Sequence, residues 1–405
     1  MRSFEFRYEN VFVIKDNSDS SVFLMENKEP KVRKQFDFSR YQQRRIGLML
    51  AYIGWEFDGF CAQRDVQNTV EAALFDALMK TKLVASRDQA DFHICGRTDK
   101  FVSASRQVVS INVRSAVLVN DEEKKCSFTP PSKELDYPSI LNSCLPSAVR
   151  VLAWAPISRD FSARFNCKGR TYKYFFPHGN LNIEAMDVAC RHLVGSHDFR
   201  NFCKVDSGNN VVQHCMRTVR SARVFCLVPS HRRDSKSICC FEISANAFLR
   251  HQIRCIVAVL FAVGQSNESP LIIRQLLDVT EHPAKPNYCM ASGEPLLLCS
   301  TDFDDLEWQW NQKVLNDVRK RLEMYWIRHV VKNRVIEEML EQLNVYDDAA
   351  GGSLDVASAL LPSANCKSYM PLASRPTEPS LEAKQANAKN RAKRPHPQGE
   401  ESHAK

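Results

Sequence analysis

The order strand, helix, strand occurs twice along the middle of the chain, and this order limits the possible folds more than any other feature. In the first half, residues 45–53 and 109–113 read as strands around an apolar-striped helix over 70–78, and residues 149–154 add a strand. In the second half, strands are expected at 170–176, 218–227 and 238–244, with helices over 183–193 and 248–263. The repeated order predicts an α+β fold of two similar halves whose sheets could join.

The composition excludes several classes of protein. Hydrophobic residues make up 44% and charged residues 25% of the 405 residues, which is ordinary for a globular protein and unlike a collagen or a wholly disordered chain. The longest apolar run, 255–264, is about half of the roughly 20 residues that a membrane-spanning helix needs. The first residues lack the apolar stretch of a secretory signal. We therefore expect a protein that acts inside the cell, in the nucleus and/or the cytoplasm, and not on a membrane.

The cysteines and histidines do not have the spacing of a metal site. Fifteen cysteines are scattered without any C-x-x-C pair, and the 11 histidines form no H-E-x-x-H motif. Cysteines spread in this way usually serve as small buried apolar residues. The spacing therefore predicts neither a structural metal nor a disulfide.

The two ends of the chain differ from its middle. We expect an N-terminal extension over 1–43, two similar halves over 44–155 and 156–305, a helical segment over 306–345, and a disordered basic tail over 346–405. The net charge of +8 permits a nucleic-acid partner without demonstrating one. Basic stretches at 31–45, 217–223 and 319–334 are candidates for phosphate contacts, although solvated surfaces have the same composition.

A short polar loop is the first segment that suggests chemistry. Residues 95–103 read Cys-Gly-Arg-Thr-Asp-Lys-Phe-Val-Ser, between a helix and a strand. Asp99, two residues from Arg97, has the setting of a catalytic carboxylate that is held ionised. A charged surface turn has the same local pattern and is commoner, so the loop alone does not decide.

Two later segments carry further candidates. Arg170, Tyr172 and Tyr174 share one face of a strand, as a site that stacks a base and holds a phosphate requires, although an ordinary aromatic pair looks the same. In Phe-Leu-Arg-His-Gln-Ile-Arg (248–254), a helix would place Arg250 and Arg254 on one face. Arg254 would then lie near the core and need a carboxylate partner, which the sequence does not name.

Taken together, these segments resemble the TruA family of tRNA pseudouridine synthases. The motifs G-R-T-D-K, F-S-A-R-F with R-x-Y-x-Y, and F-L-x-H-Q-x-R occur in that family's order, and the start at 51–60 is similar as well. The stretches 197–204 and 248–255 look like the eukaryotic pseudouridine synthase 3 type, which acts on the anticodon arm. The resemblance covers about residues 44–305. It implies two ferredoxin-like subdomains that form one continuous, mostly antiparallel sheet with a central active cleft.

The resemblance also implies roles for individual residues. Asp99 matches the essential Asp, which engages the ribose–base unit while the uracil is detached, turned and rejoined through C5. Tyr172 matches the tyrosine that packs on the uracil and is proposed to accept the C5 proton. Arg97 matches the Arg that helps to open the nucleotide site, and Arg254 matches the partner of the Asp. With Arg170 as a further substrate contact, the implied enzyme flips uridines 38 and 39 of tRNA out of their stack, needs no cofactor and forms a homodimer.

Two positions depart from the family pattern. Phe101 and Arg106 stand where the family usually has Gly, and a Phe at a turn that requires positive φ is strained. We expect the Phe101 ring to pack inward and to fix the loop. The alternative is a non-catalytic tRNA-binding or chaperone protein that kept the fold, and an enzyme of the same family with another RNA substrate is a third possibility.

Overall fold

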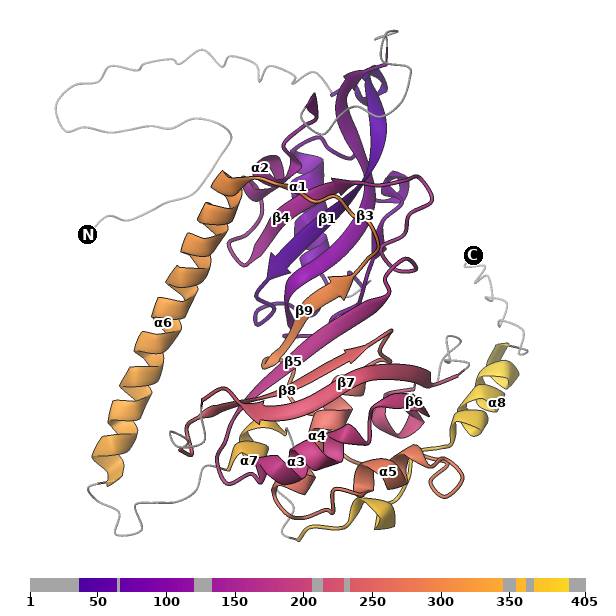
Figure 1. Ribbon diagram of the computed structural model, residues 1–405. Helices are drawn as coiled ribbons and strands as arrows, with labels where there is room; N and C mark the ends of the chain where they lie inside the picture. The colour runs from indigo at the N-terminus through magenta and orange to yellow at the C-terminus, as the bar shows by residue number, and fades with distance from the viewer. Residues whose placement is uncertain are drawn as a thin grey trace, which may run out of the picture. The chain divides into compact units, whose positions relative to one another are not determined.

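One sheet runs through both halves of the chain. In the computed structural model its strands follow the order β10-β4-β1-β3-β9-β5-β8-β7-β6, with β2 paired to β3 off this path (Figure 1). Every described pair is antiparallel except β3–β9, the parallel pair that joins the halves. The predicted continuous, mostly antiparallel sheet is therefore confirmed. The strands are β1 (Tyr41–Tyr52), β2 (His93–Ile94), β3 (Ser103–Leu118), β4 (Val149–Pro156), β5 (Gly169–Pro177), β6 (Gly195–Asp198), β7 (Met216–Cys226), β8 (Ile238–Ala245), β9 (Leu296–Asp302) and β10 (Gln309–Trp310).

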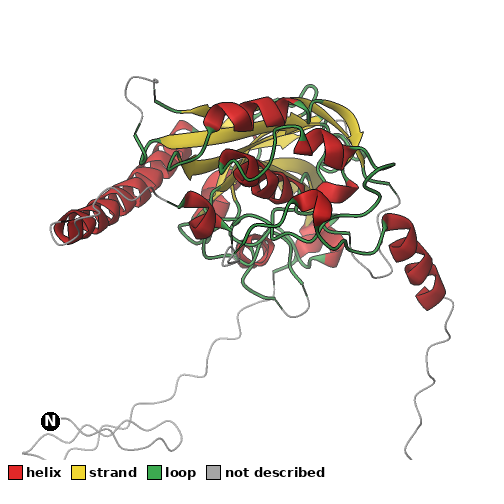
Figure 2. Cartoon of the chain, turned by 90° about the horizontal axis from the view of Figure 1, so that it is seen from below, coloured by secondary structure: helices red, strands yellow, loops and turns green. Residues whose placement is uncertain are grey.

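The structure describes residues 36–63, 66–119, 133–205, 214–228, 234–344, 355–361 and 368–392. All elements named here belong to one unit, which begins at Phe38. Seen from below, the strands form a single layer, with the long α6 projecting from one side and α8 at the other (Figure 2). The α-helices are α1 (Val70–Lys80), α2 (Tyr137–Asn142), α3 (Ile183–Arg191), α4 (Gln252–Gly264), α5 (Ile272–Leu277), α6 (Gln312–Asn344), α7 (Val356–Leu360) and α8 (Leu381–Ala392).

Strand β1 is the centre of the first half. Its residues 45–50 are all buried, because β3 pairs with one edge and β4 with the other while both of its faces are covered. Leu48 stands opposite Val109 on β3 and Trp154 on β4. Burial of such a side chain stabilises the fold by roughly 1.5–3 kcal/mol. The alternating pattern over 109–113 predicted a strand of five residues. The observed strand, β3, is much longer and has 16 residues.

The pattern Asn68-x-x-Glu71 predicts a capping box at the start of the helix near residue 70, but the structure differs. Thr69, not Asn68, is the N-cap, and its hydroxyl accepts a hydrogen bond from the Ala72 amide. Glu71 is buried and does not close a capping box. It accepts from the Ala62 amide at 2.9 Å and pairs with Arg87. The carboxylate is thus used to tie the preceding loop to the helix.

Helix α4 is buried along all 13 of its residues. It begins at Gln252, four residues later than predicted. His251, the residue before it, has a left-handed backbone with φ 60, which does not fit a right-handed helix. Arg250 therefore lies outside the helix. The predicted shared helical face of Arg250 and Arg254 is wrong for this reason.

The C-terminal part of the chain corrects a second prediction. Residues 355–361 and 368–392 were expected to be disordered, but Val356, Leu372 and Leu381 are buried in the main core. A bridge between Pro286 and Thr377 adds a backbone contact. A few apolar residues suffice when they dock on an existing core, and the average composition of a polar segment conceals them. The rest of the predicted tail lies outside the described residues.

Other predictions about the ends and the cysteines change as well. Strand β1 begins at Tyr41, inside the predicted extension 1–43, and β10, from the predicted helical segment 306–345, pairs with β4. The remaining domain boundaries stay predictions. The β7–β8 register places Cys226 opposite Cys239, and the two cysteines form a disulfide. The cysteine spacing in the sequence predicted no disulfide. None of the described helices is long and apolar enough to cross a membrane.

Candidate active site

The loop between β2 and β3 is held mainly through its backbone. The Cys95 amide donates to the Val108 carbonyl at 2.9 Å, and the Thr98 carbonyl accepts from the Phe60 amide at 3.1 Å. The Phe101 amide donates to Phe57 at 3.1 Å. These bonds tie both ends and the middle of the loop to neighbouring segments. The loop therefore has a defined course that its outward side chains do not determine.

Two buried side chains fix the turn before Asp99. The Gln107 amide group donates to the Gly96 carbonyl at 2.7 Å and accepts from the Gly96 amide at 3.3 Å. Tyr52 and Thr98 share a hydrogen bond of 2.8 Å between their hydroxyls. Sequence reasoning gave Tyr52, Thr98 and Gln107 no supporting role, because the pairing of β1 with β3 is what brings them together.

Two glycines let other segments approach the loop closely. A Cβ atom at Gly54 would lie 2.0 Å from the Val102 carbonyl oxygen. A Cβ atom at Gly293 would lie 2.4 Å from the Lys100 carbonyl oxygen. Both contacts are with backbone, which has little freedom to move away. The loop is therefore clamped from both halves of the molecule.

Asp99 meets the second half of the chain at a pair of basic groups. Its Oδ2 lies 3.5 Å from Nη1 of Arg254, and its Oδ1 lies 3.6 Å from Nε2 of His251. The Asp99 side chain is 25% exposed, whereas Arg254 and His251 are each 10% exposed. The pairing of Asp99 with Arg254, which the family resemblance implied, is present. The carboxylate of the first half thus faces the guanidinium of Arg254 from the second half.

Arg254 is itself held in place. Its Nε donates to the Ala291 carbonyl at 2.7 Å, and the Ala291 amide donates to the Arg254 carbonyl at 3.1 Å. The guanidinium is buried, so its charge requires a partner, and Asp99 supplies one. Arg254 thus connects helix α4, the loop around Ala291 and the carboxylate.

His251 is a site residue to which sequence analysis assigned no role. Burial lowers the pKa of its imidazole, and the charges of Arg254, Arg250 and Lys204 lower it further, against the opposite effect of Asp99. The imidazole is therefore neutral at neutral pH. Its position three residues before Arg254 within the F-L-R-H-Q-I-R motif was the available signal.

Tyr172, on strand β5, lies near the Asp99–Arg254 pair. It is buried, and its ring contacts that of Phe248 edge to face with centroids 5.2 Å apart. Burial raises the pKa of Tyr172 well above its usual value, and the nearby Tyr52, Cys95 and Asp99 groups add to the rise. The hydroxyl is therefore protonated in the free protein. The predicted shared face of Arg170, Tyr172 and Tyr174 is confirmed, since all three are buried on alternate positions.

Arg170 has a supporting position. Its guanidinium is buried and donates to the carbonyls of Asn246 at 2.6 Å and Cys95 at 2.8 Å. Cys95 is the first residue of the Asp99 loop, so Arg170 ties that loop to β5 and to the end of β8. Because the guanidinium of Arg170 donates to these two carbonyls, the geometry does not support the predicted phosphate contact of Arg170. Arg97, in contrast, is exposed.

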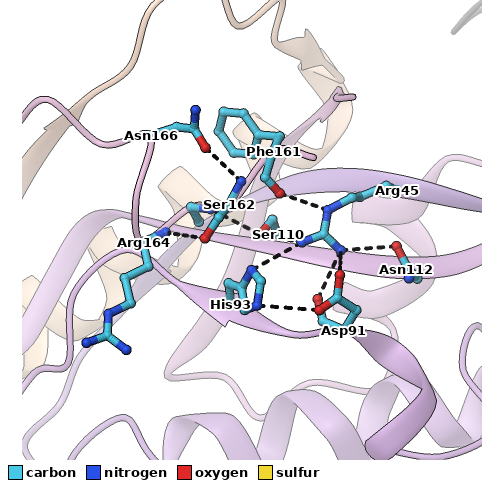
Figure 3. Close-up of polar contacts among 10 residues, drawn as sticks. Arg45, Asp91, His93, Ser110, Asn112, Phe161, Ser162, Arg164 and Asn166 are labelled. Carbon is cyan, nitrogen blue, oxygen red and sulfur yellow. Dashed lines mark hydrogen bonds and ion pairs between the residues drawn. The ribbon is translucent and has the colours of Figure 1, made fainter. Parts of the chain in front are cut away.

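A buried arginine holds the segment that enters β5. Arg45 on β1 donates to the Phe161 carbonyl at 2.8 Å and to Asn112 at 3.1 Å, and it pairs with Asp91 at 2.7 Å (Figure 3). The His93 ring lies 3.2 Å from the same guanidinium. Arg45 was a candidate for phosphate contact, and this prediction is wrong because its charge is used inside the fold.

The F-S-A-R-F segment is anchored through its backbone and leaves two side chains outside. The Ala163 amide donates to the Ser110 hydroxyl at 3.1 Å, and the Arg164 amide donates to Ser162 at 3.3 Å (Figure 3). The Arg164 side chain points away from this network. Phe165 is 75% exposed, and the Arg164 guanidinium lies 5.2 Å from its ring centroid. A fixed turn thus presents a cation and an aromatic ring to solvent.

The two departures from the family motif have different surroundings in the structure. Phe101 has φ 71, so it adopts the left-handed conformation that a Gly would adopt there. Its ring is half-buried, with the Lys100 ammonium 4.8 Å from the ring centroid, and it does not belong to the buried core. The expected inward packing is therefore wrong. Arg106 is exposed on β3, and its carbonyl accepts from Thr301 at 3.2 Å.

Comparison with known proteins gives a consistent result. Residues 189–304 match the family described as tRNA pseudouridine synthase. The tRNA pseudouridine(38/39) synthase of Mus musculus is 38% identical over 403 residues, covering 94% of this chain and 84% of the mouse protein. The enzyme of that name from Saccharomyces cerevisiae is 41% identical, covering 73% of this chain and 66% of its own length. The tRNA pseudouridine synthase A of Methanothrix thermoacetophila is 30% identical over 74% of this chain.

Proposed function

We propose that this chain, which belongs to the TruA family of tRNA pseudouridine synthases and to its pseudouridine synthase 3 type, isomerises uridines 38 and 39 in the anticodon arm of tRNA. The observation that carries the proposal is the approach of Asp99 to Arg254 at 3.5 Å, between the two halves of the sheet and beside Tyr172. The relatives that match most of this chain bear the name of this activity.

The reaction needs no second reactant, because substrate and product contain the same atoms. The bond between C1′ and N1 of the uridine breaks, the uracil turns, and a bond between C1′ and C5 forms. C5 loses its proton and N1 gains one. The protein supplies positioning and a carboxylate.

Asp99 is the group that engages the ribose–base unit in this proposal. Arg254 stabilises the charged carboxylate and fixes its direction. Because the guanidinium is buried and already in place, it does not have to reorganise when substrate binds. Because His251 is neutral, Arg254 supplies the positive charge beside Asp99. These three side chains come from both halves, so the site exists only when the halves join.

Tyr172 has two roles in the proposal. The flipped uracil packs on its ring, and Phe248 contacts that ring edge to face. Its hydroxyl is protonated in the free protein, so it accepts the C5 proton only as its own proton leaves. Arg97, exposed next to Asp99, is proposed to hold the site open, and the exposed Arg164 and Phe165 are suited to stack on unpaired RNA.

The non-catalytic alternative has no support. It rested on Phe101 and Arg106, yet Phe101 keeps the left-handed turn and Asp99 still reaches Arg254. Arg106 is exposed, and its carbonyl accepts a hydrogen bond from Thr301 on β9. We therefore retain the enzyme, acting on tRNA in the nucleus and/or the cytoplasm.

A homodimer is part of the proposal, and α6 supports it. Its first half is anchored by the buried Val314 and Val318 and by a Tyr325–Ser147 hydrogen bond of 3.2 Å. Beyond Tyr325, many large apolar side chains are exposed, and seven of them are more than half exposed: Trp326, Ile327, Val331, Val335, Ile336, Met339 and Leu343. A helix that is apolar on several sides is normally buried against others.

The charges of α6 favour a second copy as the partner. Basic Arg328, Lys332 and Arg334 precede acidic Glu337 and Glu341 along the helix. Two antiparallel copies that cross near residue 335 would bring opposite charges together, whereas parallel copies would bring like charges together. Sedimentation should show a dimer for the wild type and a monomer for Ile336→Glu with Met339→Glu, and Lys313→Glu at the exposed start of α6 should remain dimeric. A monomeric wild type would contradict this part.

The function is tested in cells that lack the protein. We expect tRNA from these cells to lose pseudouridine at positions 38 and 39 and to regain it when the wild-type chain is restored. Unchanged modification with altered tRNA folding or abundance would favour the chaperone instead.

A further inference from the structure

A cavity lies next to the catalytic pair, on the side of the second half of the chain. Its volume is about 290 Å³. His251, whose Nε2 is 3.6 Å from Asp99, forms part of its wall together with Cys255 and Met290. The mechanism proposed above does not use this space.

The charge around the cavity is unbalanced. Lys204, Lys285 and Lys384 line it, and Glu378 is the single carboxylate among the lining residues. Glu378 pairs with Lys384 at 2.6 Å and with Lys285 at 3.4 Å. Although burial acts in the opposite direction, these two ammonium groups hold the pKa of Glu378 below its usual value. One carboxylate thus serves two largely buried lysines, and Lys204 adds a third charge at the exposed rim.

An excess of two positive charges around this cavity favours an anion there. The volume is close to the lower limit of ordinary ligand pockets, so it accepts a phosphate group together with part of a sugar. We propose that this cavity binds a backbone phosphate of the tRNA next to the flipped uridine. This rests on the proposed function, because the RNA is the anion that the catalytic cleft must receive.

The C-terminal segment contributes Glu378, Pro379 and Lys384 to the lining of the cavity. Glu378 and Lys384 both come from residues 368–392, which are joined to the opposite wall by backbone bonds. The Glu378 amide donates to the Lys285 carbonyl at 2.8 Å, and the Asn287 amide donates to Pro376 at 2.9 Å. The wall from 285 to 291 ends at Ala291, which holds Arg254. The segment expected to be disordered therefore contributes a phosphate contact and supports the catalytic arginine indirectly.

The test uses the purified full-length chain and its tRNA. Lys204→Ala changes an exposed side chain and should leave the fold unaffected, whereas Lys384→Gln tests the buried charge. Both variants should raise KM for tRNA by about three- to tenfold with kcat changed less than twofold. The slope of log Kd against log salt should fall by about 0.7–0.9 for each, the amount expected for one lost phosphate contact. Lys236→Ala, an exposed lysine in the β7–β8 connection, is the matched control and should change neither quantity.

Inorganic phosphate distinguishes an RNA phosphate from a free anion. At constant ionic strength it should compete with tRNA for the wild type and compete less for Lys204→Ala. Phosphate that changes kcat without competing with tRNA would show a separate anion site and overturn the assignment. An unchanged KM and salt slope in Lys204→Ala would also overturn it. In either case a wild type that still forms pseudouridine leaves the proposed function standing, so the two failures are distinguishable.

Discussion

The two halves of the molecule hold their parts of the active site in different ways. The first half positions Asp99 through backbone hydrogen bonds of the 95–103 loop, which is packed closely against Gly54 of the same half and Gly293 of the second half. The second half positions Arg254 and Tyr172 through buried side chains on a helix and a strand. We expect a loop defined by its backbone to tolerate changes of outward side chains such as Phe101 and Arg106, and Asp99 in this loop lies 3.5 Å from Arg254. The second half should tolerate far less.

The largest expected effect is at Arg254. Arg254→Ala removes the partner of Asp99 and the bond to Ala291, so kcat should fall on the order of 10²–10³-fold. Arg254→Lys should recover little, because lysine lacks the planar fork that contacts both groups. Single-turnover assays on tRNA measure the loss. Arg274→Ala, an exposed arginine on α5, is the control and should keep its activity. An active Arg254→Ala protein would contradict the role of the second half.

The next effect tests the backbone clamp. Gly54→Ala places a Cβ atom 2.0 Å from the Val102 oxygen, so the free energy of unfolding should fall by about 1–3 kcal/mol and activity should fall with it. Gly96→Ala is the matched control, because its Cβ would meet the Tyr172 hydroxyl at an ordinary 3.6 Å. Thermal unfolding and activity should separate the two variants. Equal thermal stability and equal activity of the two variants would mean that the loop moves freely.

A smaller effect concerns pH. The pKa of His251 is lowered from 6.5, so in the pH range just below 6.5 the unfolded chain binds a proton that the folded chain does not. Stability should therefore decrease as the pH falls below about 6.5. His251→Gln should show a weaker decrease. Denaturant titrations from pH 5 to 8 measure this difference, and parallel curves for the two proteins would contradict it.

The smallest effect is at Phe101. Glycine relieves the cost of φ 71, roughly 1 kcal/mol, but loses a half-buried ring, so Phe101→Gly should change stability by less than about 1 kcal/mol. Phe101→Ala keeps the strained conformation and also loses the ring. It should be less stable than Phe101→Gly by about 1 kcal/mol. The reverse order in denaturant titrations would show that the loop changes its course.

The sequence predicted the parts of the molecule that depend on local pattern. Alternation revealed β5 and its buried Arg170, Tyr172 and Tyr174, and ordered motifs led to the Asp99–Arg254 pair. It did not predict features that depend on register or on tertiary contact. The Cys226–Cys239 disulfide and the role of Gln107 follow from strand pairing, and the burial of Leu372 and Leu381 follows from docking onto a finished core. The left-handed His251, which delays α4, has no local signal comparable to a glycine.

The most direct test of the central claim is Asp99→Asn, which keeps the shape of the side chain and removes its charge. The purified variant should form no detectable pseudouridine in tRNA under single-turnover conditions. Its Kd for tRNA should stay within about threefold of the wild type, because affinity comes mainly from phosphate contacts. Measurable turnover in Asp99→Asn would contradict the assignment of Asp99 as the catalytic carboxylate.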